Sequence, residues 1–357
     1  MEGVSDSKAH PYALALAAAA FFGASFPLSK LLLRDLGPVG LAGLLYLGSG
    51  LGIGILRLLR RSRSGAAEAT LKKSDLGWLA GVILSGGVAG PILLLLGLTR
   101  TSAHVSALLA NTETIFTMAL AIAFFGDFLI RREALGAAAI FLGATTVAWA
   151  GAQEGGQITW TGPLLLLGAG LAWGLDNNFS QRISAKDPLQ IAAIKGVAAG
   201  LVNLALAWVS EGLPRLAPAT LASALAIGFV CYGLSVVLFM TALRHLGAAR
   251  TSALFATAPG IAIALSCALL GEIPSAWTAA GAAFMIPGAW LLIRVDHSHR
   301  HLHGAIDHDH RHVHDDHHAH DHRGDEGPEP HSHPHRHAAL EHEHVHVADL
   351  HHRHSHG

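Results

Sequence analysis

The sequence predicts an all-α membrane protein with ten transmembrane helices in two inverted five-helix repeats, followed by a disordered C-terminal tail. Three observations predict this fold class: the composition, a series of apolar runs of span length, and a match between the two halves. Apolar residues make up 51% of the chain and charged residues only 14%, which is typical of a protein dissolved in lipid. The lipid bilayer is therefore an expected partner, and a water-soluble fold is not expected.

Ten apolar runs lie between charged or Gly/Pro-rich breaks, and each has the length of about 20 residues that crosses about 30 Å of hydrocarbon. They cover residues 11–33, 37–59, 76–98, 101–125, 134–151, 161–183, 189–210, 221–243, 248–270 and 275–293. The expected domains are a cytosolic segment over 1–10, two five-helix repeats over 11–151 and 152–294, and the tail over 295–357.

The distribution of Lys and Arg predicts the orientation, because these residues favour short cytoplasmic loops. The loop after the second run is the most basic and carries Arg60, Arg61, Arg63, Lys72 and Lys73. If that loop is cytoplasmic, an even number of spans places both termini in the cytoplasm. We expect a multi-pass protein of the bacterial inner (plasma) membrane. Nucleic-acid binding is not indicated, and the oligomeric state stays open.

The two halves share short motifs at matching places. The stretch Ser106-Ala107-Leu108-Leu109 matches Ser252-Ala253-Leu254-Phe255, and Gly126-Asp127 matches Gly271-Glu272. Five spans per half would insert the second half upside down, which is the inverted-repeat plan of many secondary transporters. The alternative is chance similarity between helices rich in Ala, Leu and Gly.

These motifs resemble those of the EamA-type domain of the drug/metabolite transporters, over residues 11–293. The resemblance implies a ten-helix inverted-repeat transporter with a central cavity and cytosolic termini. It also implies small metabolites, such as amino acids, as cargo. This family often has Pro in the fourth span, where this chain has Asn111-Thr112-Glu113-Thr114, whereas the ninth span keeps Pro259. We therefore expect a break at the site in the ninth span alone.

Glu113 is the first candidate for a role in transport. It lies about a dozen residues into its run, about 18 Å deep at helical rise. An ionisable group at that depth costs about 2.5 to 3.5 kcal/mol on insertion scales, so it is a functional candidate by default. A proton-coupling carboxyl and a protonated structural acid are equally compatible with the sequence.

Asp176 and Lys195 form the second candidate. Both lie about 14 Å from the cytosolic end of adjacent antiparallel helices, which predicts an ion pair. The pair is either a structural clamp or part of a substrate site or gate. Asn177, Asn178 and Gln181 surround it with amide groups that need partners in lipid, and some of them are expected to face the solute.

The tail changes composition abruptly and carries most of the histidines, many in His-x-His runs interleaved with carboxylates. Neutral imidazoles on one side of an extended chain suit Zn, Ni, Co or Cu, so a divalent metal is expected on the tail and no cofactor is required for transport. The expected ligands are His297, His299, His301, His303, His308, His310, His312, His314, His331, His333, His335, His337, His342, His344, His346, His351, His352, His354 and His356.

The favoured function is a secondary transporter, an exporter, of a small organic metabolite with a metal-binding regulatory tail. The alternative is a transition-metal (Ni/Co/Zn) transporter whose tail loads or buffers the ion. A non-transporting receptor with a metal-sensing tail is a third possibility. An enzyme is not expected, since the spans lack a nucleophile–base motif and an HExxH-like helix.

Overall fold

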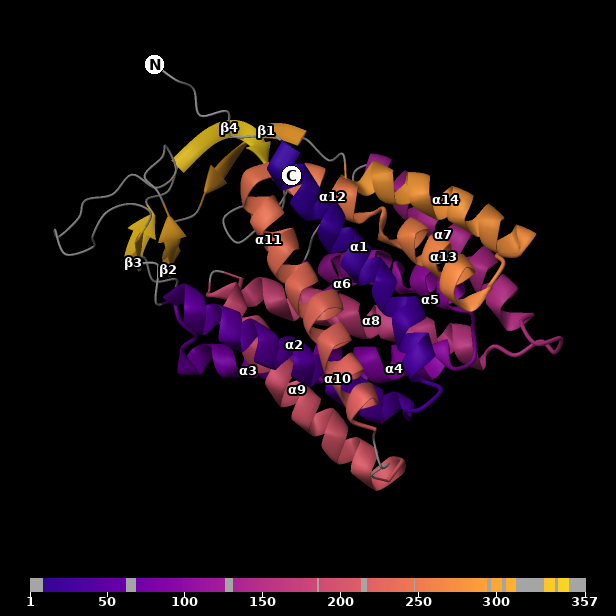
Figure 1. The fold of residues 1–357 in the computed structure, drawn as a ribbon. Coiled ribbons are helices and arrows are strands. Elements are labelled where there is room, and N and C mark those ends of the chain that lie inside the picture. The colour runs from indigo at the N-terminus through magenta and orange to yellow at the C-terminus, as the bar shows by residue number, and fades with distance from the viewer. Residues whose placement is uncertain are drawn as a thin grey trace, which may run out of the picture.

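The helices of the computed structural model follow the predicted runs (Figure 1). It describes residues 9–61, 69–125, 131–184, 186–212, 217–246, 248–293, 297–303, 306–312, 331–337 and 340–346. The first half contains α1 (Ala9–Leu32), α2 (Pro38–Arg61), η1 (Lys73–Asp75), α3 (Leu76–Val82), η2 (Ile83–Ala89), α4 (Gly90–Leu98), α5 (Ala103–Ala110), α6 (Glu113–Phe125) and α7 (Arg131–Ala152). The second contains α8 (Thr161–Arg182), α9 (Pro188–Ser210), α10 (Pro218–Ile227), η3 (Gly228–Leu234), α11 (Ser235–Leu246), α12 (Ala248–Phe255), α13 (Ala258–Leu270) and α14 (Ala276–Ile293).

Seven helical stretches among the described residues are long and apolar enough to cross a membrane. They are Pro11–Leu32, Pro38–Leu59, Lys73–Leu98, Ala103–Phe124, Arg131–Ala152, Pro188–Ser210 and Pro218–Leu243. Two shorter apolar helices, Ala258–Leu270 and Ala276–Leu292, lie in the ninth and tenth predicted runs. The sixth run forms α8, which is not among the seven, since its second half carries a cluster of polar residues that includes Asp176 and Gln181.

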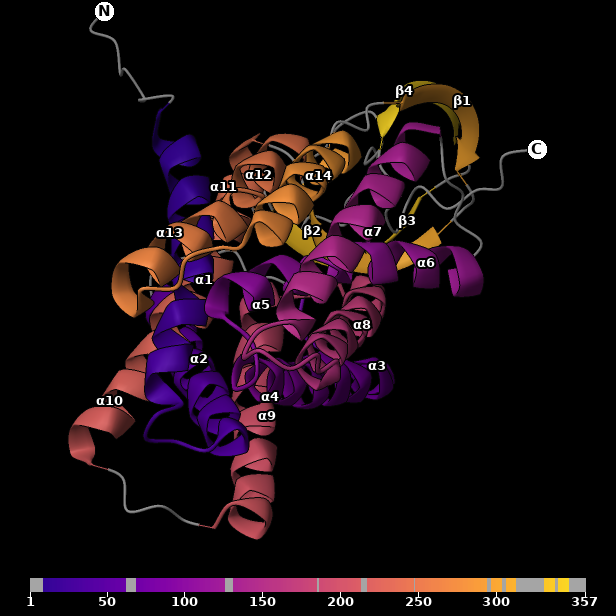
Figure 2. The same cartoon turned by 90° about the vertical axis from the view of Figure 1, so that its right-hand side faces the viewer.

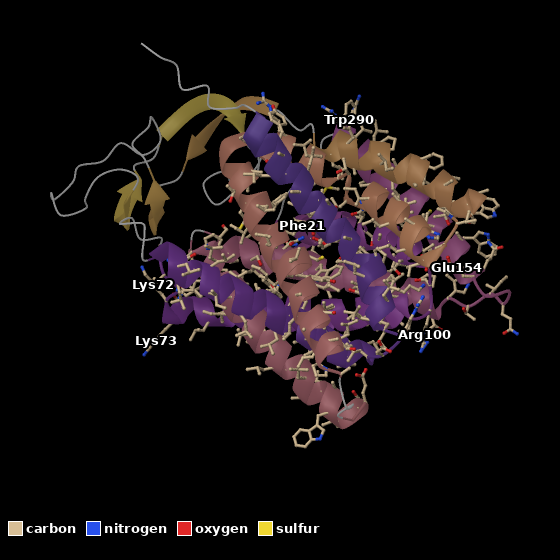
Figure 3. All side chains as sticks on the ribbon, in the orientation of Figure 1. Phe21, Lys72, Lys73, Arg100, Glu154 and Trp290 are labelled. Carbon is tan, nitrogen blue, oxygen red and sulfur yellow. The ribbon has the colours of Figure 1, made fainter. Side chains whose placement is uncertain are left out.

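The outer faces of the helices are suited to lipid. Large apolar side chains such as Leu58, Leu84 and Val209 are exposed there. Charged side chains lie toward the helix ends: Lys72 and Lys73 lie at the start of the stretch formed by η1, α3, η2 and α4, and Arg100 lies just after its end (Figure 3). This separation of apolar faces from charged ends is that of a membrane-spanning bundle.

Two helix pairs are packed closely through glycine, α2 with α9 and α7 with α14 (Figures 1 and 2). A Cβ added to Gly50 of α2 would lie 2.3 Å from the backbone nitrogen of Val197 in α9. A Cβ added to Gly143 of α7 would lie 2.6 Å from the carbonyl oxygen of Gly281 in α14. Small residues let the two helix backbones come close together. Close van der Waals contact then holds the helices together, because in lipid there is no hydrophobic effect between them.

The packing of the two halves follows one pattern. Helix α1, the first span, packs against α11 and α13 of the eighth and ninth predicted spans. Helix α8, the sixth, packs against α4 and α6 of the third and fourth. The first helix of each half therefore packs against the third and fourth predicted spans of the other half. The π-helical segments follow the same pattern, because η2 lies in the third span and η3 in the eighth.

The expectation of a helix break in the ninth span alone was wrong. The ninth span breaks between α12 and α13, and the fourth breaks between α5 and α6 although it lacks proline. At that break the hydroxyl of Thr112 donates to the carbonyl of Leu109, and the amide of Asn111 bonds to the carbonyl of Leu108. Side-chain hydroxyls that bond to the local backbone offer an alternative to helical bonding, which explains a break without proline.

Parts of the tail are ordered into strands, which differs from the disordered tail that the sequence predicts. Strand β1 (His297–His303) pairs antiparallel with β4 (Leu340–His346), and β2 (Ile306–His312) pairs antiparallel with β3 (His331–His337). The strand pairs lie beside the helices in Figure 1. The alternation of histidine with other residues has the period of two that places alternate residues of a strand on the same face.

Candidate functional site

The π-helical segment η2 is the centre of a cluster of polar side chains inside the bundle. Pro91 follows it and has no N–H, so it cannot donate to the carbonyl of Gly87 in an α-helix or to that of Gly86 in a π-helix. Side chains supply the missing donors. Tyr46 Oη donates to the Gly86 carbonyl at 2.6 Å and Trp173 Nε1 at 3.2 Å.

Asn203 completes this arrangement from α9. Its Nδ2 donates to the Gly87 carbonyl at 3.0 Å, and the residue is fully buried. The sequence analysis missed Tyr46, Trp173 and Asn203 as parts of the site. The signal that would have found them is Pro91 itself, because a buried carbonyl that loses its helical donor must find another.

The predicted contact between Asp176 and Lys195 is confirmed. Lys195 Nζ of α9 lies 2.5 Å from Asp176 Oδ2 of α8, beside η2. Asp176 is buried, and its second oxygen, Oδ1, is buried without a hydrogen-bond partner among the described residues. The packing is tight, since a Cβ on Gly86 would lie 2.2 Å from the Asp176 carboxyl carbon.

Glu113 is the first residue of α6, at the break in the fourth span. Its Oε1 accepts a hydrogen bond from Asn177 Nδ2 at 2.8 Å, and Asn177 also donates to Thr117 Oγ1. Because the N-terminus of a helix carries partial positive charge, this position suits a carboxylate. The charges of Asp176 and Lys195 act on Glu113, so the three ionisable residues form one electrostatic unit.

Asn178 and Gln181, the two remaining predicted residues, both lie on α8. Asn178 is buried and donates to the carbonyls of Thr117 and Gly174, which uses both hydrogens of its amide. Gln181 lies in the last turn of α8, toward the helix end. The structure thus brings Glu113, Asp176, Asn177 and Lys195 together, ties Asn178 to α6 and places Gln181 at the periphery.

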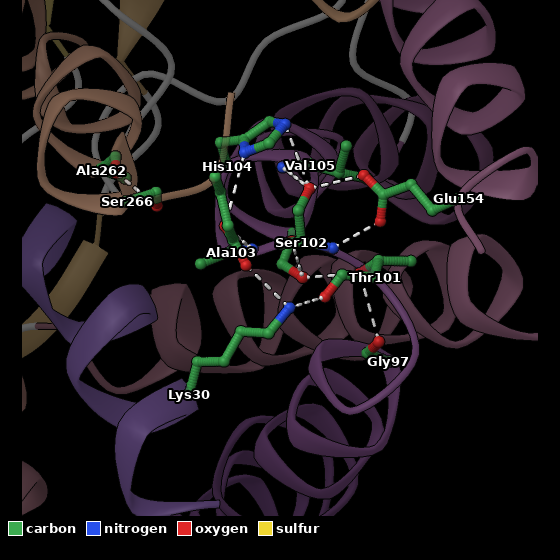
Figure 4. A network of polar contacts seen from close by, with 12 residues as sticks. Lys30, Gly97, Thr101, Ser102, Ala103, His104, Val105, Glu154, Ala262 and Ser266 are labelled. Carbon is green, nitrogen blue, oxygen red and sulfur yellow. Dashed lines mark hydrogen bonds and ion pairs between the residues drawn. The ribbon is translucent and has the colours of Figure 1, made fainter. Parts of the chain in front are cut away.

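A second polar network connects the end of α1, the start of α5 and the chain that follows α13 (Figure 4). Lys30 at the end of α1 pairs with Glu272 Oε1 at 2.9 Å and donates to the carbonyl of Thr101. Glu272 Oε2 accepts from the amide of Ala103 at 2.7 Å and lies 3.4 Å from His104 Nδ1. The first residues of α5 are thereby connected to the chain that follows α13.

Glu154 holds the same helix start from another direction (Figure 4). Its two carboxylate oxygens accept from the amide and the hydroxyl of Ser102, each at 2.6 Å. Ser102 is the N-cap of α5, so both Glu154 and Glu272 bind where unpaired amides and the helix dipole favour negative charge. This network, which closes one end of the bundle, was not predicted from the sequence.

The network fixes the charge of Glu272, which lies in the loop after α13. Burial alone would raise the pKa of its carboxyl, but hydrogen bonds from His104, Lys30 and the Ala103 amide, with the Lys30 charge, lower the pKa from 4.5 to about 2. Its contribution to folding is therefore complete above about pH 4.5 and is lost as the pH falls toward 2.

We expect Glu272→Gln to lower the stability of the detergent-solubilised protein by about 1 kcal/mol near pH 7, since partial exposure weakens these charged hydrogen bonds. The difference from wild type should shrink as the pH falls below about 4.5, as followed by thermal unfolding across pH. Asp35→Asn, at an exposed acid, is the matched control. A difference that grows toward acid pH would contradict this role of Glu272.

Apolar spans, charged ends and a buried ionisable cluster at broken helices define a multi-pass integral membrane protein of the transporter class. The chain belongs to the EamA-like transporter family, which matches residues 10–149 and 160–294.

A curated relative from Methanothermobacter thermautotrophicus, described as an uncharacterized transporter, is 28% identical over 302 residues, or 82% of this chain and 88% of the relative. A solved crystal structure aligns with 80% of this chain and 96% of its own at a TM-score of 0.56 and 16% identity, a likeness of fold alone.

Proposed function

We propose that this protein is a secondary transporter that exports a small organic metabolite, such as an amino acid, through the cluster around η2. The observation that carries the proposal is the position of Glu113 at a helix break inside the bundle, where it is bonded to Asn177, the residue next to Asp176 of the Asp176–Lys195 pair. Ionisable residues inside a membrane mark substrate or ion pathways, and transporters place such sites at discontinuous helices.

The proposed architecture is ten spans in two inverted five-helix repeats. Support comes from the shared packing pattern of the two halves, from π-helical segments in the third and eighth spans, and from breaks in the fourth and ninth. We place both termini in the cytoplasm of a bacterial inner membrane, because the basic loop after α2 is then cytoplasmic. The network of Lys30 and Glu272 would then close the outer end.

Glu113 is proposed as the proton-coupling carboxyl, and a structural acid remains the alternative. We expect Glu113→Gln to abolish solute flux driven by a pH gradient in liposomes, because an amide cannot carry the proton, while solute exchange at equal pH persists at saturating solute. Asp35→Asn is again the control. Unchanged gradient-driven flux in Glu113→Gln would remove Glu113 from coupling, and absence of flux for every solute in wild type would contradict transport.

The tail is proposed to bind Zn, Ni, Co or Cu and to regulate transport. The strand register supports this, because histidines stand opposite histidines. His297, His299 and His301 of β1 stand opposite His346, His344 and His342 of β4. His308, His310 and His312 of β2 stand opposite His335, His333 and His331 of β3. Residues opposite one another in antiparallel strands have Cβ atoms about 5 Å apart, which suits shared coordination. His303, His337 and the predicted ligands 314, 351, 352, 354 and 356 have no such histidine partner in the described register or lie outside the described residues.

A further inference from the structure

The polar cluster around η2 contains two buried acceptor atoms to which no donor among the described residues is bonded. Lys195 donates to Asp176, Tyr46 and Trp173 donate to Gly86, and Asn203 donates to Gly87. Each of these donor groups makes at least one hydrogen bond within the protein. On the acceptor side, Asp176 Oδ1 and Asn203 Oδ1 are both buried without a hydrogen-bond partner among the described residues. Buried acceptors of this kind are costly unless something donates to them.

The charges in the cluster are also unequal. Glu113 and Asp176 are two carboxyl groups, and Lys195 is the one cation whose charge acts on Glu113 among the described residues. The lysine is committed to Asp176 at 2.5 Å. With both carboxylates ionised, the cluster carries one uncompensated negative charge in a low-dielectric setting, which a proton or a cationic ligand would balance.

We propose that this site binds its solute through a protonated amine, held between Asp176 Oδ1 and the carboxylate of Glu113. An ammonium group offers three N–H donors and one positive charge, which suits the unpaired oxygen of Asp176 and the excess of carboxylates over cations at the site. The inference rests on the proposed transport function and names the substrate class of the same site.

Other solute classes fit this site less well. A carboxylate solute would bring a third negative charge beside Glu113 and Asp176, and Lys195 alone would not balance three carboxylates. An amino acid could place its ammonium group in the site, but its carboxylate would compete with Asp176 for the charge of Lys195. We therefore expect the site to bind amines without a carboxylate most tightly, amino acids less tightly and carboxylates least tightly.

The test is thermal unfolding of the full-length protein in detergent with 1,4-diaminobutane, L-alanine, butyrate or tetramethylammonium. We expect 1,4-diaminobutane to raise the Tm by about 5 °C at 100 times its Kd and butyrate to leave it unchanged. Tetramethylammonium has the charge but no N–H, so a smaller shift is expected. An equal shift would show attraction by charge alone and would overturn the donor argument.

Variants assign the binding to this site. Glu113→Gln should weaken 1,4-diaminobutane binding at least about 10-fold, since a hydrogen bond to a charged group is lost. Asp176→Asn should do the same if it folds, and Asp35→Asn should leave the shift unchanged. A wild-type shift that persists in Glu113→Gln, a shift with butyrate, or none with any amine would overturn the amine site. Flux of a non-amine solute without amine binding would contradict the amine site and support the transport function. Amine binding without flux of any solute would support the amine site and contradict the transport function.

Discussion

Reversing either charge of the central pair, in Asp176→Lys or Lys195→Asp, should destabilise the protein by at least about 3 to 5 kcal/mol, because two like charges then face each other in place of a matched pair. Asp176 is the more deeply buried partner, with 10% of its side chain exposed against 19% of the Lys195 side chain. The double reversal should recover part of the folded yield lost in each single variant, measured by thermal unfolding and size-exclusion chromatography. Strict additivity of the two losses would refute a direct energetic coupling.

The chain contains a matched control for this experiment. Arg57 of α2 pairs with Asp187 at 2.7 Å, with 23% and 10% of the two side chains exposed, at the start of α9 and away from η2. Breaking either pair should lower stability, but only the central pair should change solute flux per folded molecule. Equal flux per folded molecule in Lys195→Ala and Arg57→Ala would make Asp176–Lys195 a structural clamp.

Removal of the tail after Arg294 should leave a folded protein that still moves its solute, since the spans hold the polar cluster. The same truncation should abolish high-capacity Zn or Ni binding and any metal dependence of flux. In the full chain, metal binding should weaken as the pH falls below about 6.5, because protons compete for imidazole. Equilibrium dialysis with Zn and flux in liposomes, with micromolar metal on the tail side, measure both effects.

A narrower variant tests the strand register. Replacing His342, His344 and His346 of β4 by Ala should also remove sites that involve β1, because these residues stand opposite His301, His299 and His297. The control replaces His317, His318 and His320, which lie outside the described residues. If Zn coordinates only neighbours along the chain, the two triple variants will lose equal amounts. Loss of flux on truncation, together with passage of Zn in the full protein, would favour the metal-transporter alternative.

Much of the membrane domain could be predicted from the sequence because apolar length and charge act locally. Hydrophobic runs of span length predicted the helices, and the depth of Asp176 and Lys195 from a shared hairpin predicted their contact. The break at Asn111 and Thr112 could not be predicted from the family pattern, because it depends on side-chain hydroxyl bonds rather than on proline.

The sequence by itself determined the solvent of this protein, its helical class, its family and the residues too polar to lie in lipid without a role. Only the tertiary structure decided which groups meet. Tyr46, Trp173 and Asn203 come from different helices, and they converge on the Gly86 and Gly87 carbonyls of η2, to which Pro91 has no N–H to donate. Likewise, Lys30 and Glu272 are far apart in the chain, and their pairing depends on how α1 packs against α13. Hydrophobicity is a property of each segment, whereas the satisfaction of a buried polar group depends on its neighbours in space.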